Sequence, residues 1–210
     1  MPIENAQLAA LLFTVSFAAG LNVYATVATL GLLARAGVLV LPGQLDPVAN
    51  SWVIGASALL FVIELVADKI PIFDLMWNAL QTFVRVPVGA LIAYAATSPL
   101  GPGWQAVATV TGGAIALAAH SAKTAARAAV TPSPEPFSNF ALSATEDVFT
   151  IFITWFATRH PLVAAGIVTV LLIGIALMVR WIVRGVGKFV RAATAQVCGS
   201  LIVGSDAGPH

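Results

Sequence analysis

The chain has 210 residues, of which 59% are hydrophobic and 9% are charged, whereas a soluble protein has about 25% charged residues. The 10 basic and 9 acidic side chains cannot cover a folded chain of this length, and the mean hydropathy of +0.94 agrees with that conclusion. The net charge of +1 excludes an electrostatic nucleic-acid binder. The single cysteine excludes an internal disulfide and a cysteine-based metal cluster. The composition predicts a polytopic membrane protein.

Turn segments that contain proline divide the apolar sequence into six stretches, each near the roughly 20 residues that cross a bilayer. We predict an all-α transmembrane bundle over residues 1–191, followed by a flexible cytoplasmic tail over residues 192–210. Because the second stretch is short and the last turn is tight, a re-entrant hairpin stays open as an alternative. The six predicted spans cover residues 7–33, 50–67, 75–97, 104–127, 140–158 and 161–183.

The placement of lysine and arginine predicts the orientation, because these residues are enriched in cytoplasmic loops. With the N-terminus inside, only Arg35 and Arg159 fall on the outer side, and Arg85 lies within the third span. We therefore expect both termini in the cytoplasm. The basic residues on the cytoplasmic side are then Lys69, Lys123, Arg127, Arg180, Arg184, Lys188 and Arg191.

Basic residues continue beyond the sixth stretch at spacings of four, four and three, which places them on one helical face. The opposite face is apolar. This pattern predicts an amphipathic helix that binds anionic lipid at the membrane surface. Its basic residues are Arg180, Arg184, Lys188 and Arg191.

Residues 55–100 resemble residues 112–162. On the predicted topology, the two segments are hairpins that form a parallel repeat about an axis along the membrane normal. Because apolar sequences align easily by chance, coincidence stays open as the alternative. The repeat would pair Glu64 with His120 and Arg85 with Asp147.

Ionisable residues inside the predicted spans are the most informative feature of the sequence. Each such charge costs about 2.5–3.5 kcal/mol at the bilayer centre, so we expect these side chains to face the interior and one another. Glu64 and Asp68 share one face of the second span, and a basic stripe follows one face of the fourth. We expect these two faces to meet, and Arg85 to approach Glu146 or Asp147. The basic stripe consists of His120, Lys123 and Arg127.

Two interpretations of these charges stay open. They are either structural ion pairs that fix the register of the helices, or the lining of a partly hydrated cavity that opens to the cytoplasm. His120 is the residue whose ordinary pKa lies nearest neutral pH. The acidic residues and His120 are also suitable ligands for a divalent cation, so the sequence leaves a metal site undecided.

The first span contains Gly20, Asn22 and Tyr24 within an otherwise apolar segment. A glycine permits close helix packing or a local break, and an asparagine in the membrane needs a hydrogen-bond partner. The segment is therefore either a packing contact or a discontinuous helix that lines a binding site. Two polar loops on the cytoplasmic side complete the candidate cavity residues with Lys69, Glu135 and Asn139.

The motifs AAGLNVYAT, ELVADKIPIFD, AAHSAKTAARAAV and SPEPFSN resemble the bacterial membrane proteins grouped as domain of unknown function 4126. The resemblance covers residues from about 15 to 180. The Asn22-Val23-Tyr24 segment departs from the Asn-Pro-Tyr of that pattern, which puts a proline-driven helix break in doubt. The resemblance implies a multi-pass protein of the bacterial inner membrane and implies no activity.

The sequence contains no nucleotide-binding, zinc-protease or serine-hydrolase motif, so we predict no enzyme and no cofactor. The leading hypothesis is a small transporter or channel-like protein whose charged cavity takes a proton, a cation or a small anionic solute. The alternative is a non-transporting scaffold or assembly subunit with structural ion pairs. The expected partners are the lipid bilayer and either a second copy or a subunit of a membrane complex.

Overall fold

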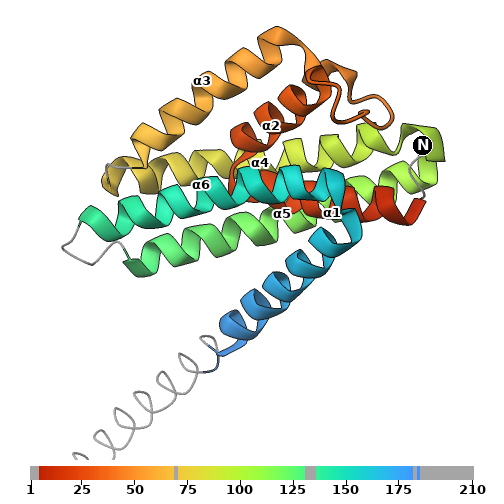
Figure 1. Ribbon diagram of the computed structural model, residues 1–210. Coiled ribbons are helices and arrows are strands. Elements are labelled where there is room, and N and C mark those ends of the chain that lie inside the picture. The colour runs from red at the N-terminus through yellow and green to blue at the C-terminus, as the bar shows by residue number, and fades with distance from the viewer. Residues whose placement is uncertain (1–4, 69–70, 131–135, 182–183, 185–210) are drawn as a thin grey trace, which may run out of the picture. The chain divides into compact units, whose positions relative to one another are not determined.

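The computed structural model describes residues 5–68, 71–130, 136–181 and 184. Within these ranges it contains seven α-helices and no strand, which confirms the predicted all-α class (Figure 1). The helices are α1 (Asn5–Leu21), α2 (Val23–Arg35), α3 (Ser51–Ala67), α4 (Pro71–Ala96), α5 (Pro102–Val130), α6 (Pro136–Arg159) and a further helix over Pro161–Trp181. Two short 3-10 helices are η1 (Asp46–Ala49) and η2 (Ser98–Leu100).

The chain divides into two compact units, Met1–Thr169 and Val170–His210. The first unit contains α1–α6 and is described below. In the second unit, the described residues form the later part of the Pro161–Trp181 helix. Arg180 and Arg184 are exposed. Lys188, Arg191 and the predicted tail over residues 192–210 lie outside the described residues, so the basic amphipathic helix stays a prediction.

Helix α1 forms the centre of the first unit, where it packs against α4, α5 and α6. Its sequence is apolar on every side, which is typical of a helix with neighbours all around it. Val15, Phe17 and Ala18 are buried. A Cβ atom added at Gly20 would lie 2.7 Å from the Ala119 Cβ atom of α5. The glycine therefore allows α1 and α5 to pack closely.

The chain reverses direction at Asn22, between α1 and α2. Helix α1 runs in the same direction as α5, because its first turn lies near Trp104 and its last carbonyl lies near Lys123. Helix α2 then returns toward the start of α3, where Arg35 contacts Ser51. The two helices form a hairpin with Asn22 at its tip (Figure 1), which we call the α1–α2 hairpin.

The α1–α2 hairpin corrects two parts of the predicted topology. Residues 7–33 do not form one span, since the helix is interrupted at Asn22. The start of α1 lies at the same end of the bundle as residues 97–104, whereas the prediction placed these segments on opposite sides. The cause is an asparagine that caps a new helix where no proline or charge signals a turn.

Two described helices are long and apolar enough to cross a membrane, Met76–Ala96 and Pro161–Trp181. The six predicted spans are therefore not confirmed, because α1, α2 and α3 have only 17, 13 and 17 residues. The predicted repeat also finds no support. Helix α3 is much shorter than its proposed counterpart α5, which has 29 residues.

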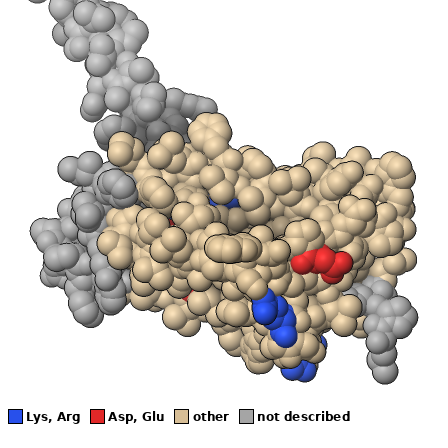
Figure 2. Space-filling model, turned by 90° about the horizontal axis from the view of Figure 1, so that it is seen from above, with Lys and Arg blue, Asp and Glu red and all other residues tan. Residues whose placement is uncertain are grey.

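The first unit exposes apolar side chains and buries charged ones. Trp52, Phe83 and Val110 are 85%, 80% and 73% exposed, whereas Glu64 and Arg85 are fully buried. Figure 2 shows a face on which charged side chains are few and widely separated. Such a surface is unfavourable in water, because large contiguous apolar patches are normally covered.

Candidate functional site

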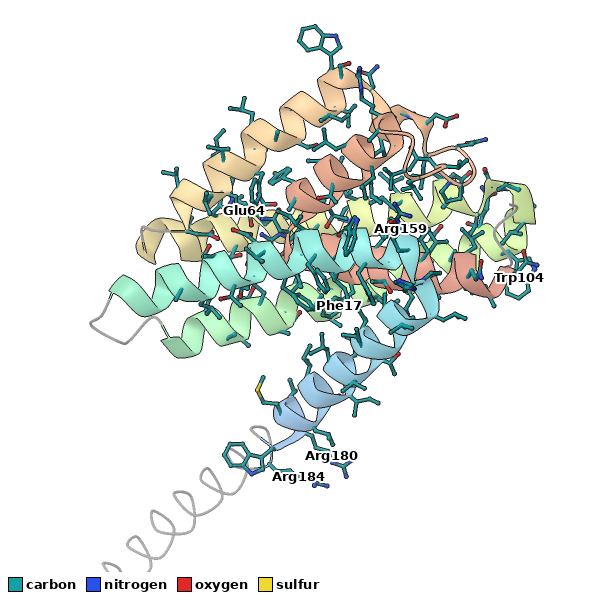
Figure 3. The ribbon with its side chains drawn as sticks, in the orientation of Figure 1. Phe17, Glu64, Trp104, Arg159, Arg180 and Arg184 are labelled. Atoms are coloured by element: carbon teal, nitrogen blue, oxygen red, sulfur yellow. The ribbon has the colours of Figure 1, made fainter. Side chains whose placement is uncertain are left out.

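Charged side chains from α3, α4, α5 and α6 meet in the interior of the bundle, near the tip of the α1–α2 hairpin. Glu64 points from α3 into this region (Figure 3). These side chains form what we call the charged core, which consists of Glu64, Asp68, Arg85, His120, Lys123, Arg127, Glu146 and Asp147. Glu64 and Asp68 at the end of α3, and His120, Lys123 and Arg127 on α5, are spaced three or four residues apart, so each set shares one helical face. Helix α4 contributes Arg85, and α6 contributes the adjacent Glu146 and Asp147.

Glu64 joins two cations at the centre of the charged core. It forms ion pairs with Arg85 and with Lys123, whose Nζ atom lies 3.3 Å from the Glu64 Oε1 atom. The predicted approach of Arg85 to Glu146 or Asp147 is therefore wrong. Arg85 lies at the depth of Glu64, and the two fully buried charges neutralise each other.

Arg127 joins α5 to both α3 and α6. Its Nη2 atom lies 2.7 Å from Asp68 Oδ2 and 2.9 Å from Glu146 Oε2. The Ser143 hydroxyl also donates a hydrogen bond of 2.9 Å to Asp68 Oδ2. The acidic face of α3 thus meets the basic stripe of α5 as the sequence predicts. Glu146, whose side chain is 12% exposed, is the least buried of these three partners.

His120 accepts a hydrogen bond from Arg85, whose Nη1 atom lies 3.1 Å from His120 Nδ1. A guanidinium group can only donate, so Nδ1 carries no proton. The proton of the neutral ring then sits on Nε2, which lies 2.8 Å from the Thr82 hydroxyl oxygen. His120 therefore acts as a neutral link between Arg85 and Thr82 in this structure.

The charged core holds the helix end on one side of the break, and Asn22 caps the helix on the other side. At the end of α1, Lys123 Nζ donates to the Leu21 carbonyl at 3.0 Å, and Arg85 Nη1 donates to the Gly20 carbonyl at 3.4 Å. These cations satisfy carbonyls that lack helical partners and lie at the negative end of the helix dipole. At the start of α2, Asn22 Oδ1 accepts from the Ala25 amide at 3.0 Å.

Asn22 also links the hairpin to α6. Its Nδ2 atom donates to Asp147 Oδ1 at 2.8 Å. Asn22 is fully buried and Asp147 is 4% exposed, so water cannot readily replace this bond. The break in the helix and the acidic residue of α6 therefore form one connected site.

Three carboxylate oxygens of the charged core are buried and have no hydrogen-bond partner within the described part of the chain. They are Glu64 Oε2, Asp68 Oδ1 and Asp147 Oδ2. A buried charged oxygen without a donor is costly. These atoms therefore mark where a proton or another positive group would be stabilised.

Sequence reasoning missed a polar stripe on α6 that continues from the charged core. Ser143, Asp147, Thr150 and Thr154 follow one another at spacings of four, three and four, and all are buried. Thr150 and Thr154 donate to the carbonyls one helical turn earlier. The spacing itself was the available signal, because polar residues at this period define one helical face.

The other candidate residues have mixed outcomes. Tyr24 lies outside the charged core, where its hydroxyl accepts a hydrogen bond of 3.1 Å from Gln81. Lys69, Glu135 and the side chain of Asn139 lie outside the described residues. Within the described residues, no group of three or more histidine, cysteine, aspartate and glutamate side chains is arranged to hold a metal ion.

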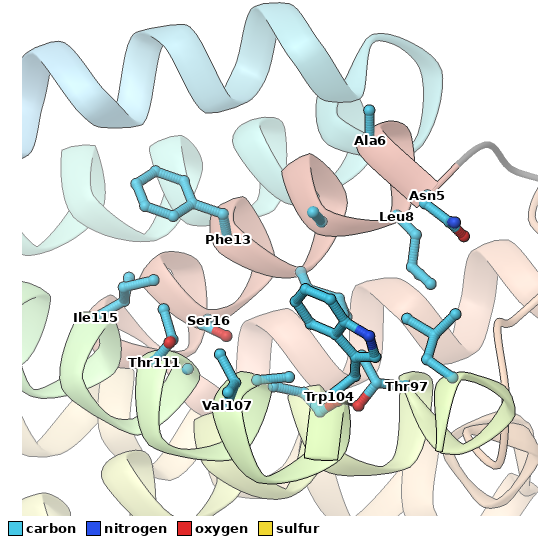
Figure 4. Close-up of a pocket in the computed structure, with 16 residues that line it drawn as sticks. Asn5, Ala6, Leu8, Phe13, Ser16, Thr97, Trp104, Val107, Thr111 and Ile115 are labelled. Atoms are coloured by element: carbon cyan, nitrogen blue, oxygen red, sulfur yellow. Dashed lines mark hydrogen bonds between the residues drawn. The ribbon is translucent and has the colours of Figure 1, made fainter. Parts of the chain in front are cut away.

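The charged core is closed in this structure, whereas one of the two interpretations of the sequence is a cavity open to the cytoplasm. Its members pair with one another and leave little surface for water. A separate apolar pocket of about 610 Å³ lies near the other end of α1 (Figure 4). Its lining includes Leu8, Phe13 and Trp104, and the described residues around it carry no charge. The pocket therefore suits an apolar group and is not the ion site.

The geometry defines an all-α bundle with an apolar surface and a closed charged core at a broken helix. The family described as Domain of unknown function (DUF4126) matches residues 9–181. The chain belongs to this family, as its motifs indicate, and the description assigns no activity. No curated protein and no solved structure matches the chain significantly.

Proposed function

We propose that the protein is a small transporter or channel-like protein of the bacterial inner membrane, and that the charged core is its site for a translocated ion. The exposed apolar side chains and the buried charges support a lipid environment. The charged core contains four carboxylates and three cations besides neutral His120, so it carries one net negative charge. This balance favours a cation or a proton over an anionic solute.

The observation that carries the proposal is the break at Asn22, where Lys123 of the charged core binds the end of α1, and Asn22 both caps α2 and binds Asp147 of the core. Transporters place the ends of discontinuous helices at their substrate sites. Ionisable groups within a membrane are costly, and they mark ion or proton pathways. A break that served packing alone would not need Lys123 and Asp147 at its two ends.

The α1–α2 hairpin also changes the proposed topology. Basic residues favour the cytoplasmic side for the end of the bundle that holds Lys123 and Arg127. The start of α1 lies at the opposite end, so the hairpin enters from the outer side. Single cysteines at Asn5 and Asp46, in a Cys198→Ser background, should react with an impermeant reagent outside the cell. A cysteine at Ala141 should not react, and labelling of Asn5 and Ala141 from one side would refute the topology.

The alternative is a non-transporting scaffold or assembly subunit. The closed, ion-paired state of the charged core favours it, since buried ion pairs can serve to fix geometry. The two functions differ in what a charge change does. In a scaffold, neutralising a member of the core affects only folding or assembly, whereas in a transporter it also abolishes flux from a folded protein.

Ion flux into proteoliposomes tests the proposal, with protons, sodium, potassium and magnesium offered separately. Glu146→Gln should abolish or strongly reduce flux while the protein still unfolds cooperatively, because the side chain is partly exposed and keeps its shape. Asp46→Asn is the matched control, since Asp46 is exposed on η1, and the nearby Gln44 amide binds the Ala95 carbonyl at the end of α4. Absence of flux for every ion, in protein that is shown to be folded, would favour the scaffold.

A further inference from the structure

Asp147 differs from the other acidic residues of the charged core. Glu64, Asp68 and Glu146 each form an ion pair with lysine or arginine. Asp147 receives a single hydrogen bond, from Asn22, and no cation lies within ion-pair distance of it in the described ranges. Its Oδ2 atom is buried without a partner. A carboxylate in such a place lacks the stabilisation that the other three have.

We propose that Asp147 binds a proton that the protein carries or uses to drive transport, and that Asn22 transmits the protonation state to the break in the hairpin. The proposal rests on the proposed function for its role in transport, but the proton site itself does not depend on flux. In the uptake step, Asp147 Oδ2 forms a bond to one proton delivered from water as hydronium. The carboxylate becomes a neutral carboxylic acid, and the charged core changes from one net negative charge to none.

The surroundings of Asp147 permit this change without a rearrangement of ion pairs. The charged groups that act on it from packed helices are Lys123 of α5 and Glu64 and Asp68 of α3. On α6 its sequence neighbour is Glu146, which is already paired with Arg127. The hairpin contributes no charge at this point and supplies the neutral amide of Asn22. The nearby acids oppose a further negative charge, while Lys123 is held by Glu64 and the Leu21 carbonyl.

A proton is favoured over a metal or alkali cation by the state of the α1 carbonyls. Carbonyls at a helix break are the groups that coordinate sodium in transporters with discontinuous helices. Here the Gly20 and Leu21 carbonyls already accept hydrogen bonds from Arg85 and Lys123. Arg85 and Lys123 thus occupy the place beside these carbonyls where a metal cation would bind. Asp147 Oδ2 has no partner, and a proton needs only this one oxygen.

Protonation acts on the hairpin through Asn22. The Asn22 amide donates to Asp147 and its oxygen caps α2, so one side chain joins the acid to the helix start. A hydrogen bond to a charged acceptor is stronger than one to a neutral acceptor. Uptake of the proton therefore weakens the link between α6 and the tip of the hairpin, and release of the proton restores it.

Infrared difference spectroscopy of the full chain in lipid tests the proton site directly. Lowering the pH should produce a carboxylic-acid C=O band that shifts when aspartate, and not glutamate, carries a ¹³C carboxyl label. Asp147→Asn should remove this band, and Asp46→Asn should leave it. Asn22→Ala should shift its frequency, because the acid loses its hydrogen-bond donor.

If Asp147→Asn fails to fold, the labelled wild-type chain still shows that the C=O band belongs to an aspartate. The frequency shift of that band in Asn22→Ala then assigns it to Asp147. A band that persists in Asp147→Asn, or that Asn22→Ala leaves unmoved, would overturn the proposal. A band that behaves as expected in protein without ion flux would support the proton site and refute the transporter. If flux occurs, Asp147→Asn should remove its dependence on pH.

Discussion

Replacing Asn22 with alanine should show how the helix break is held together. The substitution removes the amide that donates to Asp147 at 2.8 Å and the oxygen that accepts from the Ala25 amide at 3.0 Å. It leaves the fully buried site without either bond. The α1–α2 hairpin would keep its apolar contacts and lose the polar link at its tip.

The size of the effect follows from these two bonds. Loss of an N-cap costs about 1 kcal/mol, and a buried acceptor left without its donor costs about 1–3 kcal/mol. We therefore expect Asn22→Ala to lower the free energy of unfolding by about 2–4 kcal/mol, since the two losses are separate. The loss should be larger at high pH, where Asp147 is charged, and smaller at low pH, where it is protonated.

Unfolding by denaturant in detergent micelles, followed by tryptophan fluorescence, measures this free energy. The control is the same substitution in an Asp147→Ala background, where it should cost only the cap, about 1 kcal/mol. The difference between backgrounds is the coupling energy of the pair. Equal losses in both backgrounds would refute the link between the hairpin and α6, and a loss below about 0.5 kcal/mol would refute both bonds.

Three further substitutions test other contacts by the same unfolding measurement. Arg127→Ala removes the cation shared by the buried Asp68 and the partly exposed Glu146 and should cost about 3–5 kcal/mol; a cost near 1 kcal/mol, about that of an exposed pair, would mean that the core is hydrated. Gly20→Val places a side chain against α5 and should cost about 1–3 kcal/mol through overpacking, whereas an unchanged stability would contradict the close approach of α1. Tyr24→Phe removes the hydroxyl that accepts a hydrogen bond from the Gln81 side chain of α4. It should lower the free energy of unfolding by about 0.5–1.5 kcal/mol and leave ion flux unchanged. A loss of flux would place Tyr24 in the ion site.

The sequence predicted which charges gather, because energetic cost and helical spacing act locally. Glu64 and Asp68 share a helical face, and so do the basic residues of α5, so their meeting followed from charge alone. The partner of Arg85 could not be predicted in this way. Arg85 pairs with Glu64 because of the position of α4 along the bundle, and this position is set by tertiary packing.

The reversal at Asn22 was harder to predict for a different reason. The apolar run over residues 7–33 continues through the break, and no proline marks it. The break is stable because Lys123 and Arg85 bind its free carbonyls, and the Asn22 side chain binds the free amide of Ala25. Lys123 and Arg85 lie 102 and 65 residues from the carbonyls that they bind, and the Asn22 side chain can cap α2 only when the helix has already opened. A polar residue in an apolar helix therefore signals a site without telling whether the chain turns there.

The order in which the ribosome makes this chain has a consequence for its assembly. The α1–α2 hairpin is synthesised before α6, and the acid that binds its tip lies 125 residues further on. Until α6 emerges, the opened backbone and the Asn22 amide lack their final partners, and contacts of such sequence separation form late. The hairpin is thus made before α6 but is among the last parts of the bundle to reach its final contacts. In a chain truncated before α6, the hairpin should lack its contact with Asp147 and should be degraded by the proteases that remove incomplete membrane proteins.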